Sequence, residues 1–154
     1  MRLLFNTKYL TLVALLLSVS CSAPKPAATD PQEALAFSKD QIWQLVSVKG
    51  KAVAVPNTIT LILNQETGTL YGQSYCNRYF ADFTAHLAEQ SQEGCRYAMK
   101  ISYLGSNDTR CPEADMEAEG RYLALLPKAD ACVLKPYTLT FYRSGKEILK
   151  YELQ

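Results

Sequence analysis

The sequence has little of the material from which catalytic and metal sites are usually built. It contains one histidine, His86, and its five cysteines include no Cys-x-x-Cys pair and no two that lie close together. Zinc sites and dithiol redox sites both favour closely spaced cysteines. We therefore expect no metal, no cofactor and no catalytic residue.

The sequence also lacks a strong net charge and an apolar run long enough to span a membrane. The formal charge is +1, and it becomes −1 when Arg2 and Lys8 are removed with residues 1–20. A near-neutral chain with dispersed charge does not have the electrostatic pattern of a nucleic-acid binder. The apolar run at residues 9–17 is shorter than the roughly 20 residues of a spanning helix. We expect neither nucleic-acid binding nor a transmembrane helix.

The N-terminal segment has the pattern of a secretory signal. Basic residues precede the apolar run, and Ser18 and Ser20 precede Cys21, as in signal peptides. Two routes of processing fit: ordinary cleavage after Ser20, or cleavage at a site that resembles a bacterial lipoprotein signal, with acylation of Cys21. Ser18 stands where such signals prefer leucine. We expect residues 1–20 to be a signal peptide and Cys21 to carry a lipid; the alternative is a secreted or soluble periplasmic protein.

The next segment has the composition of a linker. Residues 21–38 are rich in proline, alanine and small polar residues, which is typical of a flexible tether. Ser22, directly after Cys21, resembles the signal for sorting to the outer membrane of Gram-negative bacteria. We expect an outer-membrane lipoprotein facing the periplasm, and a folded domain over residues 39–154.

The folded part alternates mostly with a period of two. Five strands are predicted before one helix and three after it, over residues 41–50, 58–65, 69–75, 79–87, 95–105, 131–136, 137–143 and 147–153. Pro112 suits the start of the helix and Pro127 its end, while Gly120 inside it suggests close packing on the sheet. The predicted class is mainly β (α+β): a small antiparallel, barrel-like sheet of about eight strands with one covering helix.

Four cysteines remain when Cys21 is set aside. An even number in an exported chain indicates disulfides, and four cysteines allow three connectivities, which the residues alone leave open. A Cys–His nucleophilic pair would need a reduced thiol, and alternation places His86 on a polar face with Asp82 and Thr84. We therefore expect His86 to be a surface residue.

Several stretches together resemble the META domain, also called the HslJ-like family. They are "IWQLVSVKGK", "GQSYCNRYFADF", "DTRCPEADMEAEGRYLALL" and "LTFY", and they extend from about Gln41 to the C-terminus. Tyr75 and Ala81 stand where the family often has glycine, and residues 88–96, which include Cys95, resemble an insertion. The motif residues are Trp43, Leu45, Gly72, Cys76, Asn77, Tyr79, Thr109, Cys111, Met116, Glu119, Tyr122, Leu139 and Phe141.

The resemblance implies a small β-barrel-like domain with one helix, often on an outer-membrane lipoprotein. Family members are tied to envelope stress, drug tolerance and secretion without a defined reaction. The resemblance also implies a Cys76–Cys111 disulfide, and with it a second bridge between Cys95 and Cys132. The expected partner is then the membrane, through the lipid anchor. An envelope protein or a lipid is expected as a further ligand, and the protein is expected to be a monomer.

Three motif residues and the tyrosines of the predicted strands have alternative interpretations. Glu119 could act as an acid or base, but one carboxylate without a partner supports no reaction, so we expect it to bond the Cys-Asn loop. Asn77 suits a turn, by bonding its own backbone or adopting a positive φ, rather than a substrate site. Trp43 is expected in the core with its N–H bonded nearby. Strand tyrosines either cover a small core or line the mouth of a barrel that holds a lipid or peptide, namely Tyr71, Tyr75, Tyr79, Tyr97, Tyr103, Tyr137 and Tyr142.

We therefore expect a non-enzymatic envelope lipoprotein that acts in stress, drug tolerance or assembly. The alternative is a periplasmic chaperone or secretion pilot that binds a lipid or peptide, which predicts a deep apolar cavity. A hydrolase or a thiol redox enzyme is the third possibility, and it requires a free, reactive thiol.

Overall fold

The computed structural model describes residues 36–53 and 59–154. The predicted signal peptide at residues 1–20, the lipidation site Cys21 and most of the predicted tether at residues 21–38 lie outside the described residues. The strands are β1 (Trp43–Val48), β2 (Lys51–Ala52), β3 (Thr60–Asn64), β4 (Thr69–Gln73), β5 (Arg78–Ser91), β6 (Gly94–Ser106), β7 (Ala131–Lys135), β8 (Thr138–Arg143) and β9 (Lys146–Leu153).

These strands form one antiparallel sheet that closes on itself. Their order is β2-β1-β3-β4-β5-β6-β7-β8-β9, and a further pairing of β1 with β9 completes a barrel of eight strands. The short β2 pairs with β1 outside this ring. The expected mainly β fold, an antiparallel barrel of about eight strands with one helix, is confirmed; two residues are too few for the alternation that would have predicted β2.

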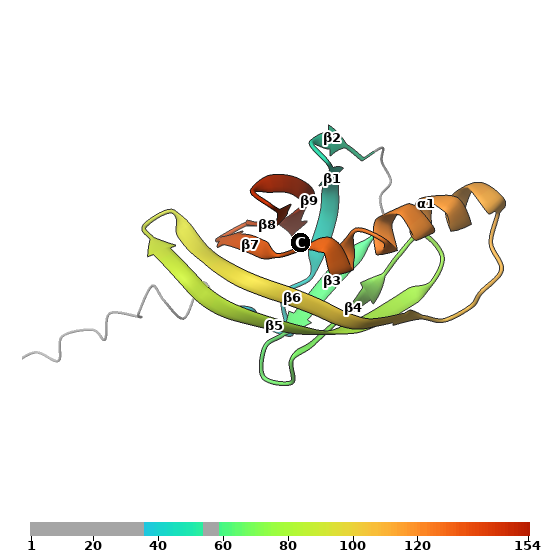
Figure 1. Cartoon of the computed structure of the whole chain (residues 1–154). Coiled ribbons are helices and arrows are strands. Elements are labelled where there is room, and N and C mark those ends of the chain that lie inside the picture. The colour runs from blue at the N-terminus through green and yellow to red at the C-terminus, as the bar shows by residue number, and fades with distance from the viewer. Residues whose placement is uncertain (1–35, 54–58) are drawn as a thin grey trace, which may run out of the picture.

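Alternation along β5 shows how the sequence builds the interior. Tyr79, Ala81 and Phe83 are buried, whereas the intervening residues of that strand are exposed, because successive side chains point to opposite faces. The hairpin of β5 and β6 extends beyond the rest of the sheet (Figure 1). Phe37 packs near Phe83, with ring centroids 6.0 Å apart, so the chain that enters from the N-terminal side is fixed to the barrel here.

Large side chains occupy the barrel interior. Trp43, Phe141 and Tyr151 are each 0% exposed, and the rings of Phe141 and Tyr151 pack edge to face with centroids 5.5 Å apart. Trp43 was expected in the core with a bonded indole N–H. It is buried, but among the described residues its Nε1 has no hydrogen-bond partner.

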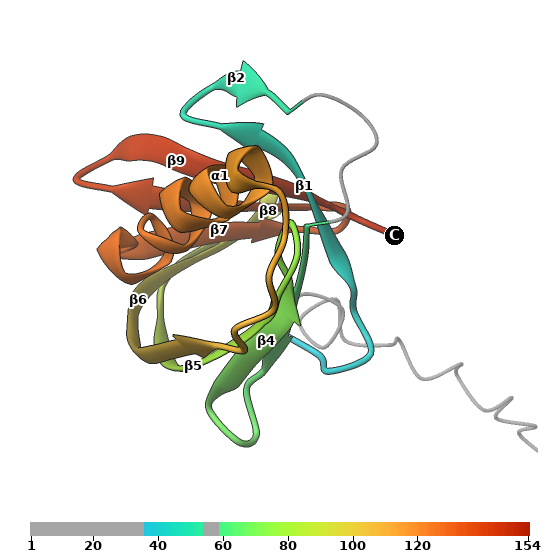
Figure 2. The same cartoon turned by 90° about the vertical axis from the view of Figure 1, so that its right-hand side faces the viewer.

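The helix α1 (Glu113–Leu123) follows Pro112 and ends before a 3-10 turn, Leu126–Lys128, that contains Pro127. It lies at the end of the molecule opposite the tip of the β5–β6 hairpin (Figures 1 and 2). The expected close packing at Gly120 is wrong, since a Cβ there would have no atom within 4 Å. Within the described ranges, no helix has the length and apolar character that crossing a membrane requires.

Candidate functional site: a carboxylate cluster, a tyrosine chain and a cleft along the helix

A buried carboxylate ties the helix to the loop between β4 and β5. One side-chain oxygen of Glu119 accepts hydrogen bonds from the Ser74 hydroxyl at 2.5 Å, the Asn77 N–H at 3.0 Å and the Cys76 N–H at 3.2 Å. Its other oxygen accepts from the Asn77 side-chain amide at 2.7 Å. We call these four residues the Glu119 cluster. Glu119 therefore bonds the Cys-Asn loop, the role weighed above against acid or base chemistry.

Asn77 links three segments that are far apart in the sequence. Its amide nitrogen donates to Glu119, and its amide oxygen accepts a hydrogen bond from the Thr109 N–H at 2.8 Å. Asn77 is 4% exposed and is not among the described residues with positive φ. Its side chain therefore joins the loop, the helix and the segment before the helix, which differs from the local turn role expected from sequence.

The cluster stabilises Glu119 in its ionised form. Burial raises the pKa of this carboxyl, but hydrogen bonds from the Ser74 and Asn77 side chains and from two backbone N–H groups lower it more, so its pKa lies below the usual 4.5. Hydrogen bonds to a carboxylate favour the charged form. Glu119 is thus a permanent acceptor at neutral pH rather than a proton carrier.

A disulfide fastens the same loop to the start of the helix. Cys76 and Cys111 are bonded, with Cα atoms 6.3 Å apart. The second expected bridge, Cys95–Cys132, is absent: both are buried free thiols. Cys95 pairs with Leu134 and Cys132 with Tyr97, so the two cysteines are diagonal rather than opposite. Diagonal neighbours lie about 7–8 Å apart, beyond the usual range of a disulfide, about 4.4–6.8 Å between Cα atoms.

Three buried tyrosine hydroxyls form a chain beneath the helix. Tyr79 donates to the Thr60 carbonyl at 2.7 Å, and its oxygen lies 2.7 Å from that of Tyr122. The Tyr122 oxygen lies 3.1 Å from that of Tyr151. Each hydroxyl has one proton. Because Tyr79 donates to Thr60, Tyr122 must donate to Tyr79 and Tyr151 must donate to Tyr122, so the chain has one direction.

This chain depends on a glycine and on burial. A Cβ at Gly72 would overlap the Thr60 carbonyl oxygen and lie 2.9 Å from the Tyr79 hydroxyl, so only glycine leaves room for that bond. Burial raises the pKa of Tyr79, Tyr122 and Tyr151 well above the usual 10.0. The neighbouring Tyr122 raises the pKa of Tyr79 further, whereas a hydrogen bond with a neighbouring hydroxyl offsets part of the rise at Tyr122 and Tyr151. The three hydroxyls therefore stay protonated and act as a fixed polar connection in the core.

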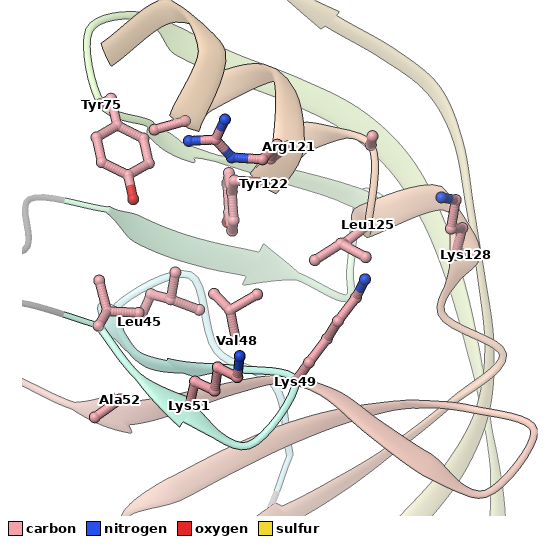
Figure 3. A pocket seen from close by; sticks show the side chains of 13 residues that line it. Leu45, Val48, Lys49, Lys51, Ala52, Tyr75, Arg121, Tyr122, Leu125 and Lys128 are labelled. Carbon is pink, nitrogen blue, oxygen red and sulfur yellow. The ribbon is translucent and has the colours of Figure 1, made fainter. Parts of the chain in front are cut away.

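A cleft separates the helix from β1 and β2. Its volume is about 860 Å³, and we call it the α1–β1 cleft. Leu45 and Val48 face it from β1, while Tyr122 and Leu125 face it from the side of the helix (Figure 3). Tyr75, one of the strand tyrosines considered above, points its hydroxyl toward the same space. The floor of the cleft is thus apolar.

Positive side chains surround this floor. Lys49 and Lys51 rise from the β1–β2 side, and Arg121 and Lys128 come from the helix and the turn after it (Figure 3). Arg121 pairs with Glu117 at 3.2 Å, whereas none of the three lysines has an ion pair within the described chain. None of the 13 lining residues is acidic.

The remaining predicted residues lie on the surface or in the core. His86 and Met116 are exposed, and Tyr71, Tyr103 and Tyr137 are at least 40% exposed. The other strand tyrosines differ: Tyr79 and Tyr97 are buried, and Tyr142 lies under the Arg96 guanidinium. In the part of the chain that the structure describes, no group of three or more His, Cys, Asp or Glu side chains is placed to hold a metal ion.

A comparison with models of known protein families identifies the family of this chain. A model of the META domain matches residues 34–154. The chain belongs to the META domain family. The Glu119 cluster, the disulfide and the tyrosine chain therefore lie within the META domain.

Two solved structures are similar to this chain, and the first of them shares its fold. An NMR structure of a protein from Burkholderia xenovorans is 23% identical and has a TM-score of 0.55, with 97% of this chain and 99% of that chain covered. A second NMR structure is 22% identical with a TM-score of 0.49, and the match covers 79% of this chain and 92% of that chain. A search of curated proteins finds no match.

Sequence reasoning missed the cleft in this META domain. Its cations come from the turn between β1 and β2, from β2 itself, from the helix and from a 3-10 turn, so no local motif indicates them. The one available signal was "VKGK", residues 48–51, where a lysine precedes glycine in a tight turn.

Proposed function

We propose that this protein is a non-enzymatic lipoprotein of the bacterial outer membrane whose META domain faces the periplasm and binds a ligand in cell-envelope stress, drug tolerance or assembly. The signal pattern before Cys21 supports the anchor. The α1–β1 cleft carries the binding role, because an open apolar site with few convergent polar groups is the usual form of a ligand pocket. The protein acts as a monomer in this proposal.

The groups that could perform chemistry are engaged elsewhere, which supports a role without catalysis. The Glu119 carboxylate accepts four hydrogen bonds, which hold the loop between β4 and β5. Burial raises the pKa of the Cys132 thiol to about 12, although Arg96 lowers it. Since the thiolate is the nucleophile, a protonated, fully buried Cys132 is a poor candidate for thiol chemistry.

A lipid- or peptide-binding chaperone or secretion pilot is the second candidate. The cleft favours it, because its floor is apolar and about 860 Å³ in volume. The deep cavity that this function predicts would have to lie inside the barrel, where Trp43, Phe141 and Tyr151 take up space. A ligand of such a chaperone would therefore bind in the cleft, between the helix and β1.

Fractionation of cells tests the anchor. Cys21→Ser should move the protein from the outer-membrane fraction to the soluble periplasmic fraction, because the acylated atom is lost. The wild-type chain treated in parallel is the control. An unchanged membrane distribution of Cys21→Ser would refute a lipid anchor at this residue.

Complementation of a deletion strain under envelope stress separates binding from catalysis. Ala118→Trp would place a large ring from α1 in the cleft, and we expect it to lose function while the protein stays folded. Cys132→Ala removes a buried thiol without touching the cleft, and we expect it to retain function. The reverse result, with Cys132→Ala inactive but folded, would support a thiol enzyme.

A further inference from the structure

We infer that the α1–β1 cleft binds a single-chain amphiphile with an anionic head, either a carboxylate or a phosphate. The alkyl chain lies on the apolar floor, and the head lies among Lys49, Lys51, Arg121 and Lys128. This inference rests on the proposed function, that the META domain is a binding module, and it specifies the class of ligand.

The floor offers apolar contact but little that is polar. Leu45 and Leu125 are at most 7% exposed, whereas Val48 and Val53 are only partly buried against the core. The volume of about 860 Å³ falls within the roughly 300–1,000 Å³ of small-molecule sites. An alkyl chain laid here would be removed from water at about 0.8 kcal/mol per buried CH₂ group.

The charges around the floor select the head group. Four cations line the cleft and no acidic side chain does. None of the three lysines has an ion pair in the described ranges. Arg121 is held by Glu117 on the exposed helix surface, a pair of small energy that leaves further guanidinium N–H groups. Carboxylate and phosphate oxygens are the acceptors that such groups bind most strongly.

The side chains that line the cleft offer few hydrogen-bond acceptors to a peptide. Apart from Tyr75 and Tyr122, no lining side chain has a hydrogen-bond acceptor. The Tyr122 oxygen already accepts from Tyr151, as the direction of the tyrosine chain requires. A peptide backbone carries one N–H group per residue that must be satisfied when buried. An alkyl chain has no such demand, so we favour the amphiphile over an acidic peptide.

The backbone at Lys49 provides a way to test that side chain. Lys49 and Gly50 form the turn between β1 and β2 with φ of 49° and 74°. A turn with two positive φ values prefers Asn, Asp or Gly at its first position, and other residues there are strained. The turn between β8 and β9 has the same form at Ser144 and Gly145, with φ of 49° and 77°, and provides a matched control outside the cleft.

Calorimetric titration of the full chain with Cys21→Ser, purified without detergent, tests the ligand class. The probes are laurate and lauryl phosphate, dodecyl maltoside, dodecyltrimethylammonium, inorganic phosphate, an acidic peptide with apolar residues, and vesicles containing phosphatidylglycerol. We expect laurate and lauryl phosphate, below their micelle concentrations, to bind at least about tenfold more tightly than each other probe, a difference of about 1.4 kcal/mol.

Variants locate the site. Lys49→Asn should weaken laurate binding several-fold while raising the melting temperature, because it removes a cation and relieves the strained turn. Ser144→Asn should raise the melting temperature in the same way and leave binding unchanged. Ala118→Trp should abolish binding of the chain without loss of the folded barrel, checked by the near-ultraviolet circular dichroism of Trp43 and the tyrosines.

Four results would overturn the inference. They are equal binding of dodecyl maltoside and laurate, equal binding of inorganic phosphate, preferred binding of the peptide or the vesicles, and no binding of any amphiphile. Unchanged laurate affinity in both Lys49→Asn and Ala118→Trp would also overturn it, because the site would lie elsewhere. None of these results alters the fractionation and complementation tests, so failure of the ligand class is distinguishable from failure of the proposed function.

Discussion

Adjacent faces of helix α1 meet the barrel in opposite ways. The Glu119 carboxylate and the Tyr122 hydroxyl lie where each polar group has a partner: the carboxylate has four donors, and the hydroxyls form a directed chain. Ala118 and Arg121 instead face the α1–β1 cleft, which Tyr122 also lines and where the lysine charges have no ion pair among the described residues. The helix is thus fastened along one face and open along the other.

This difference separates structural from functional polar groups. A buried polar group must be satisfied, and losing its partner is costly. Exposed charges contribute little to stability, so a convergent set of them beside an apolar floor needs another explanation. We therefore expect substitutions in the Glu119 cluster to change stability strongly, and the loss of a charge around the cleft to change binding with little effect on stability.

The largest effect is expected for Glu119→Ala. The substitution leaves Ser74, Asn77 and two backbone N–H groups without their acceptor in a buried site, and breaking such a charged network costs about 3–5 kcal/mol. Urea unfolding followed by circular dichroism measures the loss. Glu117→Ala on the exposed face of α1 is the control and should change stability by no more than about 0.5 kcal/mol. Equal, small effects of the two substitutions would remove the distinction between the faces.

A smaller effect is expected when acid titrates the same carboxyl. The pKa of Glu119 is lowered in the folded state from its usual 4.5. Its contribution to stability is therefore complete above about pH 5, declines as the pH falls below the unfolded value, and is lost once the pH passes the lowered folded value. The wild type should lose stability over this window relative to Glu119→Gln, measured by urea unfolding at several pH values. A constant difference down to about pH 2 would contradict the lowered pKa.

Tyr79→Phe should have an intermediate effect. It removes the donor to the Thr60 carbonyl and the acceptor of the Tyr122 hydroxyl, which leaves buried polar groups unpaired at a cost of about 1–3 kcal/mol. Tyr137→Phe, at a site 75% exposed, is the control and should be neutral. Thermal unfolding distinguishes them, and a neutral Tyr79→Phe would mean that the chain adds nothing to stability.

The sequence predicts some features of the fastened face better than others. The Cys-Asn loop, Glu119 and the alternating strands form local patterns, so the barrel class and the link from Glu119 to the loop followed from them. The partners of Asn77 and the tyrosine chain did not, because Tyr79 and Tyr122 are 43 residues apart. Alternation indicates which side chains point inward, but which hydroxyls meet depends on the closure of the sheet.

Other misses have equally specific physical reasons. The family resemblance implied a second bridge between Cys95 and Cys132, whereas the register of β6 and β7 offsets these residues by two positions. A one-dimensional pattern contains no register. The cleft depends on three elements brought together by closure of the barrel, and its lysines look like ordinary surface residues when read along the chain.

Gly120→Ala tests whether α1 is limited by its own helix propensity. Gly120 is exposed inside the helix, and an added Cβ meets nothing within 4 Å. Alanine should therefore raise the free energy of unfolding by about 0.5–1 kcal/mol. Ala124→Gly, just after the last residue of α1, is the converse control and should destabilise. A loss of stability in Gly120→Ala would show that the added methyl group is not accommodated, and that this position packs against a part of the protein outside the two faces described.

The smallest change in stability is expected around the cleft. Lys51→Gln and Lys128→Gln each remove an exposed charge without an ion pair in the described chain, so each should change the free energy of unfolding by less than about 0.5 kcal/mol. Lys146→Gln, at the β8–β9 turn, is the matched control in an exposed strand end. The same unfolding measurements apply to all three variants. A large loss of stability in the cleft variants alone would mean that these lysines hold the helix, and the contrast between the fastened and open faces would fail.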